Sequence, residues 1–138
     1  MTINGKLESE IGKGLLVLLG VGEDDTDSDI DYLVRKIVNM RIFPDEGDVM
    51  NLSVLDAGGD ILLVSQFTLM ASCKRGNRPS YIAAAGPAIS VPLYERFRDK
   101  LADALGKPVL TGVFGADMAV ELINDGPVTI CLDSKDIR

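Results

Sequence analysis

The sequence contains no histidine, and this absence excludes more chemistry than any other feature of its composition. Ser-His-Asp and Cys-His relays, histidine-ligated zinc and imidazole acid–base catalysis need a side chain that neither this chain nor a second copy of it can provide. The two cysteines, Cys73 and Cys131, are too few for a disulfide framework. An enzyme of this composition must use oxygen groups, backbone amides, lysine, arginine or groups of its own substrate.

Long apolar runs and an excess of basic residues are missing as well. No apolar run approaches the roughly 20 residues that cross a bilayer, and residues 1–6 lack the features of a secretory signal. We therefore expect a cytoplasmic protein with no membrane partner. The net charge of −7, from 14 basic and 21 acidic residues, argues against coating DNA or RNA by broad phosphate neutralisation. It does not exclude gripping one end of a nucleic acid.

The length and composition predict one globular domain spanning residues 1–138. Of the 138 residues, 46% are hydrophobic and 25% are charged, which is too apolar for a disordered chain. No internal repeat, linker or low-complexity tract divides the sequence.

Hydrophobic patterning predicts several strands. Asn4-Gly5 is typical of a two-residue hairpin turn between short strands. Residues 14–21 and 61–64 are continuous apolar runs, and we expect the first to lie at the centre of a sheet. Further strands are expected at 109–113, 118–123 and 128–132.

Two main helices are predicted, each with a polar cap and an apolar stripe. Ser28 can cap the first helix, and Ser90 can cap the second with Pro92 in its first turn and Gly106 at its end. The apolar stripes are Ile30, Leu33, Val34 and Ile37, then Tyr94, Phe97, Leu101 and Ala104. The fold class is therefore α/β, with mixed β-sheets or barrel-like β/β layers covered by two main helices.

An acidic run precedes the first helix. Asp25, Asp27 and Asp29 have the alternating spacing that begins a calcium loop, but Ile30 replaces the required glycine and Lys36 replaces the bidentate glutamate. A solvated helix start, where the dipole favours anions, is the preferred interpretation. We expect no metal site and no cofactor.

Residues 65–68, three of which are polar, follow an apolar strand directly. At period two, Ser65 and Phe67 would share one face and Gln66 and Thr68 the other. A bend here would expose backbone N–H groups, which can stabilise an oxyanion without a side-chain base. The alternative is an ordinary strand end whose Thr68 hydroxyl is satisfied by backbone.

Two further segments stand out. Residues 124–129 contain Gly126-Pro127, and the sequence alone favours a trans bond at that proline, since only about one X–Pro bond in twenty is cis. Lys74, Arg75 and Arg78 lie in a glycine-bearing loop that could hold phosphates, and an ordinary solvated loop is the alternative.

Ser65-Gln66-Phe67-Thr68-Leu69 and Asn124-Asp125-Gly126-Pro127-Val128-Thr129 resemble the two signature motifs of the D-aminoacyl-tRNA deacylases, first described as D-tyrosyl-tRNA deacylases. Further segments fit the same family in the same order, so that the resemblance covers nearly the whole chain. They are residues 10–21, 41–43, 76–80 and 112–118.

This resemblance implies a homodimer that hydrolyses the ester between a D-amino acid and the 3′-terminal adenosine of tRNA. Gly126-Pro127 would be cis and would enter the partner subunit's pocket, where its carbonyls exclude an L side chain. Catalysis would be assisted by the 2′-hydroxyl of the RNA, although an older interpretation makes Thr68 a nucleophile. The implied catalytic residues are Ser65, Gln66, Phe67 and Thr68; the residues of chiral selection are Asn124, Gly126, Pro127, Val128 and Thr129; the residues at the tRNA end are Lys74, Arg75, Arg78, Phe114 and Met118.

This sequence differs from the family pattern in one respect, and two other functions are alternatives to D-aminoacyl-tRNA hydrolysis. Family members carry a further N-terminal strand, with a basic residue that helps to hold the Gly-Pro motif, before the segment that begins here at Met1. A sister group of editing deacylases accepts some L-aminoacyl-tRNAs, but it varies the motif that is intact here at 65–68. The other alternative is a non-catalytic module that binds an RNA end or a protein.

Overall fold

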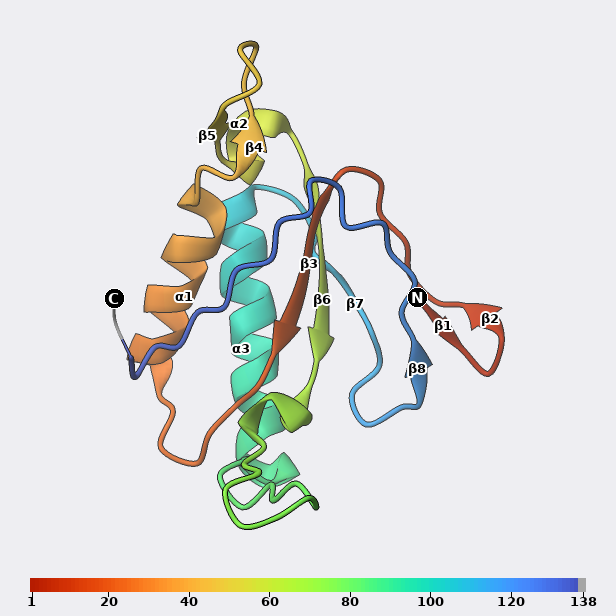
Figure 1. The fold of residues 1–138 in the computed structure, drawn as a ribbon, viewed down its shortest axis with the longest axis vertical. Coiled ribbons are helices and arrows are strands. Elements are labelled where there is room, and N and C mark those ends of the chain that lie inside the picture. Colours follow the sequence, from red (N-terminus) through yellow and green to blue (C-terminus); the bar gives the residue numbers. More distant parts are fainter. Residues whose placement is uncertain (137–138) are drawn as a thin grey trace.

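The structure is a computed structural model that describes residues 1–136. Two long helices, α1 (Asp27–Asn39) and α3 (Pro87–Leu105), lie side by side against a parallel sheet (Figure 1). The sheet contains β3 (Gly14–Leu19), β6 (Asp60–Ser65) and β7 (Leu110–Thr111), in the order β3-β6-β7.

Alternate residues of β6 face two different cores. Ile61 and Leu63 have no exposed surface and pack with α1 and α3 in the larger core. Leu62 and Val64 point to the opposite face, where they pack with Met1 in a smaller core. A strand buried on both faces reads as a continuous apolar run, which is why the sequence signal for β6 is strong.

A small antiparallel sheet covers the second face of the parallel sheet. It contains β1 (Thr2–Ile3), β2 (Lys6–Leu7) and β8 (Met118–Ala119), in the order β2-β1-β8. Asn4 and Gly5 connect β1 and β2 with φ values of 52° and 77°, as a primed hairpin turn requires. The predicted hairpin is therefore confirmed.

Three shorter features complete the fold. The strands β4 (Phe43–Pro44) and β5 (Met50–Leu52) pair with each other, and the helix α2 (Val54–Ala57) leads into β6. A 3₁₀ turn, η1 (Phe67–Met70), follows β6. The predicted mixed α/β class with two main helices is confirmed. None of the helices formed by residues 1–136 combines the length and the apolar character needed to span a membrane.

The structure differs from four of the strand predictions. β3 is an edge strand of the parallel sheet and not its centre, because β6 lies between β3 and β7. The strands expected at 109–113 and 118–123 shrink to two residues each, and no strand forms at 128–132 within the described part of the chain.

Both predicted N-terminal helix caps are wrong, whereas Gly106 ends the second helix as expected, with a φ of 82°. The first helix is capped by Thr26, not Ser28, because the Thr26 backbone N–H donates to the Asp29 carboxylate at 2.8 Å in a capping box. The second helix begins at Pro87 after Gly86, and Ser90 is buried inside it. Proline fits the first turn of a helix, where its missing N–H costs nothing.

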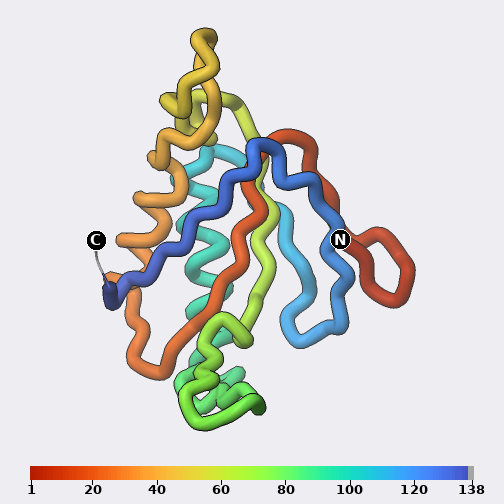
Figure 2. The backbone as a smooth tube through the Cα atoms, viewed as in Figure 1, coloured from red at the N-terminus to blue at the C-terminus, as the bar shows by residue number. Residues whose placement is uncertain are grey.

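Residues 120–136, which we call the C-terminal segment, run as extended chain over the outside of the fold. Figure 2 shows this segment passing the end of the molecule at which β3 and β6 begin and then crossing towards the start of α1. The last two residues of the expected domain, 137–138, lie outside the described residues.

Candidate functional site

The motif at 65–68 changes from strand to helical turn within one residue. β6 ends at Ser65, the Gln66 N–H donates to the Leu19 carbonyl at 2.8 Å, and η1 begins at Phe67. The expected alternation of faces is therefore wrong beyond Ser65. The bend itself is present, and a helical turn leaves its first N–H groups, here those of Phe67 and Thr68, without partners inside the turn.

Side chains of this motif are engaged with each other and with a neighbouring loop. The Gln66 amide nitrogen donates a hydrogen bond to the Thr68 hydroxyl oxygen. The Phe67 ring is 56% exposed and meets Tyr81 edge to face, with 5.2 Å between ring centroids. The Thr68 hydroxyl is therefore held by a side-chain amide and not by backbone, as the alternative interpretation had it.

The turn at 124–129 is braced by one side chain. The side-chain oxygen Oδ1 of Asn124 accepts a hydrogen bond from the Val128 N–H at 2.9 Å. The side-chain nitrogen Nδ2 of Asn124 donates to the Thr129 hydroxyl oxygen at 2.9 Å. These bonds span the Gly126-Pro127 bond, which is cis, as the family resemblance implies and contrary to the expectation from frequency alone.

Gly126 occupies a position that a side chain would not fit. Its φ is 134°, and a Cβ atom there would lie 2.9 Å from the Val128 Cγ2. Gly126 and Pro127 are both exposed in the single chain, so that their main-chain carbonyls are accessible.

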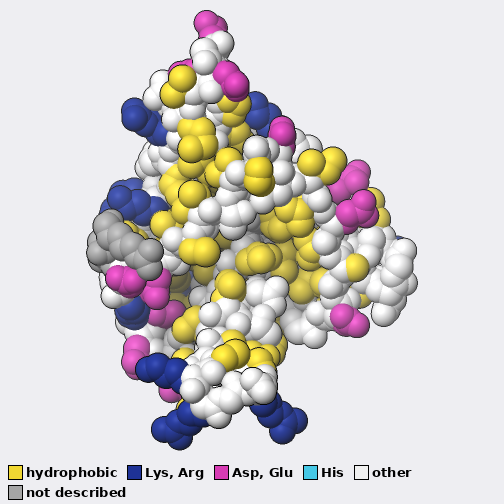
Figure 3. Space-filling view, viewed as in Figure 1, with side chains coloured by type: hydrophobic (Ala, Val, Ile, Leu, Met, Phe, Trp, Pro, Cys, Tyr) yellow, Lys and Arg dark blue, Asp and Glu magenta, His cyan; other side chains and the backbone are white. Residues whose placement is uncertain are grey.

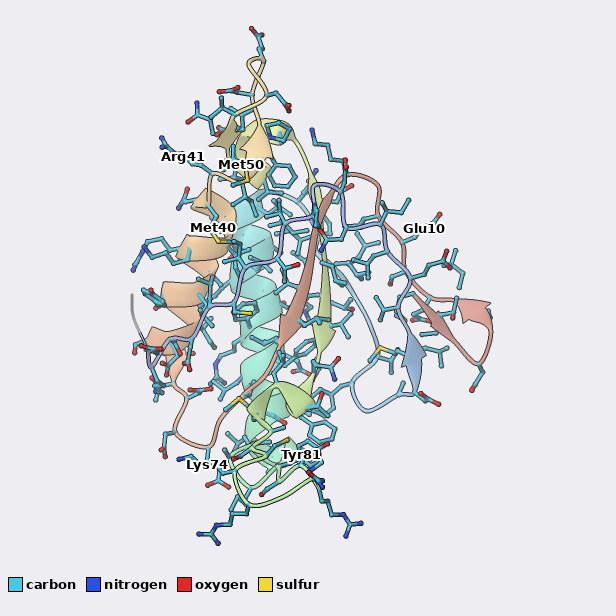
Figure 4. The ribbon with its side chains drawn as sticks, in the orientation of Figure 1. Glu10, Met40, Arg41, Met50, Lys74 and Tyr81 are labelled. Atoms are coloured by element: carbon cyan, nitrogen blue, oxygen red, sulfur yellow. The ribbon has the colours of Figure 1, made fainter. Side chains whose placement is uncertain are left out.

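The three cations of the basic loop lie at the same end of the molecule as η1. Lys74, Arg75 and Arg78 are exposed in a loop closed by Ser72 and Ser80, whose backbone groups exchange two hydrogen bonds of 2.8 Å. Figure 3 shows the cations projecting at this end, and Figure 4 places Lys74 and Tyr81 together beside η1. The fold thus brings the 65–68 motif and the basic loop into one region.

The two residues expected near the terminal adenosine differ in exposure. Phe114 is 36% exposed and packs edge to face on Tyr94, with 6.0 Å between ring centroids. Met118 instead packs against the smaller core beside Met1 and Leu62. Met118 is therefore only partly exposed.

Tyr94 supports this region, although the sequence pattern assigned it only to a helix stripe. Its hydroxyl donates to the Leu63 carbonyl at 3.2 Å while its ring holds Phe114. Burial raises the pKa of the Tyr94 hydroxyl, against the opposing effects of Arg98 and Thr111, so that it stays protonated and remains a donor. A buried tyrosine needs a polar partner, but the sequence alone does not reveal which one.

The acidic residues at the start of α1 form ion pairs with basic side chains of the same chain. Asp27 pairs with Arg96 at 2.9 Å, and Lys135 lies 3.6 Å from Asp25 and 3.0 Å from Asp29. Across residues 1–136, no three acidic or cysteine side chains are grouped so that they could hold a metal ion. Asp27 and Asp29 lie in the first turn of α1, as the helix-start interpretation predicts, but Asp29 is buried and not solvated.

The two polar motifs lie far apart within one chain. Ser65 stands where β6 ends, whereas the turn at 124–129 lies near the end at which β3 and β6 begin (Figures 1 and 2). One chain therefore presents these two motifs at opposite ends of the parallel sheet, with Phe67, Thr68, Gly126 and Pro127 exposed.

Comparison with known proteins shows to which family this chain belongs. The family model described as D-Tyr-tRNA(Tyr) deacylase matches residues 1–133. The D-aminoacyl-tRNA deacylase of Bacteroides thetaiotaomicron is 64% identical over 136 residues, covering 99% of this chain and 91% of that protein. The one from Dechloromonas aromatica is 58% identical over 135 residues, covering 98% and 90%. The chain belongs to the D-Tyr-tRNA(Tyr) deacylase family.

Solved structures agree on the fold. A protein described as c-Myc DNA Unwinding Element Binding Protein matches with a TM-score of 0.88 at 40% identity, covering 94% of this chain and 87% of that one. A probable eukaryotic D-amino acid tRNA deacylase matches with a TM-score of 0.69 at 19% identity, covering 84% and 83%. The second likeness supports the fold alone.

Proposed function

We propose that this chain hydrolyses the ester bond of D-aminoacyl-tRNA and releases the free D-amino acid and the tRNA. Membership of the family and relatives named for this activity support the proposal. Its working place would be the cytoplasm, where aminoacylated tRNA is used. Hydrolysis would keep D-residues out of translation and recycle the tRNA.

We further propose that the working site forms between two subunits. The observation that carries this proposal is that the motifs at 65–68 and 124–129 lie at opposite ends of the sheet in one chain (Figure 2). Phe67 and Thr68 of the first motif and Gly126 and Pro127 of the second are exposed. In a homodimer with two-fold symmetry, the turn of each subunit can enter the pocket of the other.

The outer face supplies apolar surface for such a contact. Exposed side chains include Leu18 of the edge strand β3 and several residues of the C-terminal segment (Figure 3). Exposed apolar side chains gathered on one face are typical of a protein interface. The segment contributes Leu122, Ile123, Ile130 and Leu132.

Catalysis in this proposal rests on backbone donors. The N–H groups at the start of η1 would hydrogen bond to the oxyanion that forms when the ester carbonyl is attacked, and such donors are each worth about 10²–10³ in rate. The 2′-hydroxyl of the terminal adenosine would assist. An aminoacyl ester is already activated, so positioning and oxyanion stabilisation suffice. The scheme involves no metal, and activity should survive EDTA.

Chirality would be read by main chain. The carbonyls of Gly126 and Pro127 would stand where an L side chain would have to lie, and the hydrogen bonds from Asn124 hold this turn. Steric exclusion rejects the wrong enantiomer without requiring contacts to the side chain of the right one. The site should therefore accept D-amino acids of several kinds.

The basic loop and Phe114 would hold the RNA end. Lys74, Arg75 and Arg78 offer local positive charge in an otherwise acidic protein, and Phe114 offers an aromatic face for a base. Met118, being packed in the smaller core, would contribute mainly by supporting this region. A grip on one terminus does not need a basic protein overall.

The direct test measures release of tyrosine from D-tyrosyl-tRNA and L-tyrosyl-tRNA. We expect rapid hydrolysis of the D-ester and an L-ester rate equal to spontaneous decay. Hydrolysis of both esters would favour the related editing activity. Binding of the tRNA end without hydrolysis of either ester would favour a non-catalytic module.

A mixing experiment tests the shared site. Thr68→Arg places a bulky side chain in the motif at 65–68. Gly126→Val places a Cβ atom in the other motif, where Val128 leaves no room for it. Each variant alone should be inactive, but heterodimers formed by refolding them together contain one undamaged site. Recovery of activity on mixing is expected; two inactive variants that stay inactive in a confirmed heterodimer would contradict a site shared between subunits.

A further inference from the structure

The C-terminal segment carries the turn at 124–129 but is weakly packed on the body of the protein. Most of its residues are exposed, and it joins no strand beyond β8 within residues 1–136. Where it crosses α1, it borders a cavity of about 320 Å³ with Tyr32 on the other side. The hydrogen bonds of Asn124 make the turn rigid internally but do not attach it to the rest of the chain.

At its far end, the segment is attached by Lys135. The Lys135 ammonium donates to Asp29 Oδ2 at 3.0 Å and to the Asp24 carbonyl at 3.4 Å, and it lies 3.6 Å from Asp25 Oδ1. Two of its three donors bond to Asp29 and Asp24, and Asp25 adds an ion pair at 3.6 Å. Although the Lys135 side chain is 54% exposed, it therefore contacts three residues and not one carboxylate alone.

The acceptors are fixed independently of Lys135. The Gly22 N–H donates to Asp25 at 2.7 Å, and the Thr26 N–H donates to Asp29 at 2.8 Å as part of the helix cap. The Asp25 and Asp29 side chains are only 20% and 11% exposed. Lys135 thus meets a preformed acidic site that is partly shielded from water, where a charge pair is screened less than on an open surface.

The other cations near α1 have different partners. Arg96 and Lys100 project from α3 and pair with Asp27 and Asp31 at 2.9 and 2.7 Å. Those pairs join two helices that already share the main core. The pair of Lys135 instead joins α1 to the C-terminal segment, which has no comparable core.

An extended chain fixed at both ends has little freedom between them, since each residue spans at most about 3.3–3.6 Å. One end of the segment is fixed by β8, which pairs with β1. The other end is held by Lys135, beside which the Ser134 side chain also hydrogen bonds to Asp29. Loss of the Lys135 ammonium removes the charged part of this attachment, so that the position of the turn relative to the body is set less tightly.

We propose that Lys135 is a positioning residue, which holds the C-terminal segment against the start of α1 and thereby sets the place from which Gly126 and Pro127 enter the site. This inference rests on the proposed function, because it concerns the placement of the proposed chiral turn. Lys135 itself touches neither the motif at 65–68 nor the basic loop. Its effect should therefore fall on the rate of the chemical step and on enantiomer selection, not on RNA affinity.

The test compares Lys135→Met with Lys100→Met in the full chain. Both changes remove one positive charge and one ion pair to α1, but only the first releases the C-terminal segment. We expect Lys135→Met to lower kcat on D-tyrosyl-tRNA about fivefold, with KM within about twofold of wild type. Lys100→Met should leave both within about twofold. Lys135→Arg, which keeps a cation with several donors, should restore most of kcat.

Hydrogen exchange supplies a readout that does not depend on activity. The Val128 N–H is bonded to Asn124 inside the turn, and release of the segment should speed its exchange in Lys135→Met but not in Lys100→Met. If wild type fails to cleave the ester, the proposed function is wrong, but the exchange measurement still shows whether Lys135 holds the C-terminal segment in place. Equal exchange and equal kcat in the two variants would overturn the role of Lys135.

Discussion

The side chain of Asn124 accepts the backbone N–H of Val128 at 2.9 Å, closing a ring around Gly126 and Pro127. The amide nitrogen of the same residue donates to Thr129 at 2.9 Å. Both hydrogen-bonding groups of one amide are thus used to shape a single exposed turn. Such local bonds from an asparagine side chain can replace the backbone pairing that a sheet would provide.

The first prediction concerns this brace. Asn124→Ala removes both bonds, and we expect kcat on D-tyrosyl-tRNA to fall about tenfold because the carbonyls of the turn lose their fixed position. Selection against L-tyrosyl-tRNA should weaken in the same variant. Single-turnover deacylation of both esters measures the two effects.

Two matched variants separate the bonds. Asn124→Asp keeps an acceptor for the Val128 N–H and loses the donor to Thr129, whereas Thr129→Val removes only the second bond. Both should fall between wild type and Asn124→Ala. An Asn124→Ala protein with unaltered rates on both esters would show that the turn holds its shape without this side chain.

The second prediction concerns the core between the helices and the sheet. Leu101 of α3 has no exposed surface, so Leu101→Ala should lower the free energy of unfolding by about 2–5 kcal/mol. Ile89 of the same helix is 42% exposed, and Ile89→Ala should cost far less. Urea unfolding at one fixed protein concentration measures both, since dimerisation would make stability depend on concentration. Equal losses in the two variants would contradict the placement of Leu101.

Local patterns predicted most elements of this fold, but they missed the exact helix starts and the order of the strands. The apolar run of β6, the turn at Asn4 and Gly5, and both helices follow from near neighbours in sequence. The edge position of β3 does not, because it depends on β6 pairing with both β3 and β7. An edge strand can be as apolar in sequence as a central strand when another segment of the same chain, or another subunit, covers it.

For the candidate site, the sequence indicated which residues to consider but not how they are arranged in space. The resemblance supplied the motifs at 65–68 and 124–129, yet period-two reasoning missed the helical turn that begins at Phe67. Lys135 gave no signal in the sequence, because a lysine near a chain end is usually solvated. Its partners lie more than a hundred residues away, at the start of α1.

The third prediction concerns pH. Burial alone would raise the pKa of Asp29, but the hydrogen bonds from Thr26, Lys135 and Ser134 outweigh burial and lower the pKa below its ordinary value. Ionised Asp29 therefore stabilises the fold above the ordinary carboxyl range, near pH 4, and this stability is lost as the pH falls through the lowered pKa.

Thermal unfolding at several pH values tests this dependence. The midpoint of wild type should exceed that of Asp29→Asn at pH 7, and the difference should shrink below about pH 4 as wild type loses the charge. Glu10→Gln removes an exposed carboxylate elsewhere and serves as the control. A difference between wild type and Asp29→Asn that stays constant down to pH 2.5 would contradict the role of the ionised carboxylate.

The last prediction is that Thr68→Ala retains most of the activity. A threonine nucleophile needs a base to take its proton, and the group next to the Thr68 hydroxyl is the Gln66 amide nitrogen, which donates a hydrogen bond and cannot accept a proton. We therefore expect the reaction to depend on the η1 backbone and the 2′-hydroxyl of the substrate, so that D-tyrosyl-tRNA ending in 2′-deoxyadenosine is cleaved far more slowly than the natural substrate. Burst kinetics and mass spectrometry of quenched wild type would detect an acyl-enzyme. Such an intermediate, together with a loss of several orders of magnitude in Thr68→Ala and normal cleavage of the deoxy substrate, would restore Thr68 as the nucleophile.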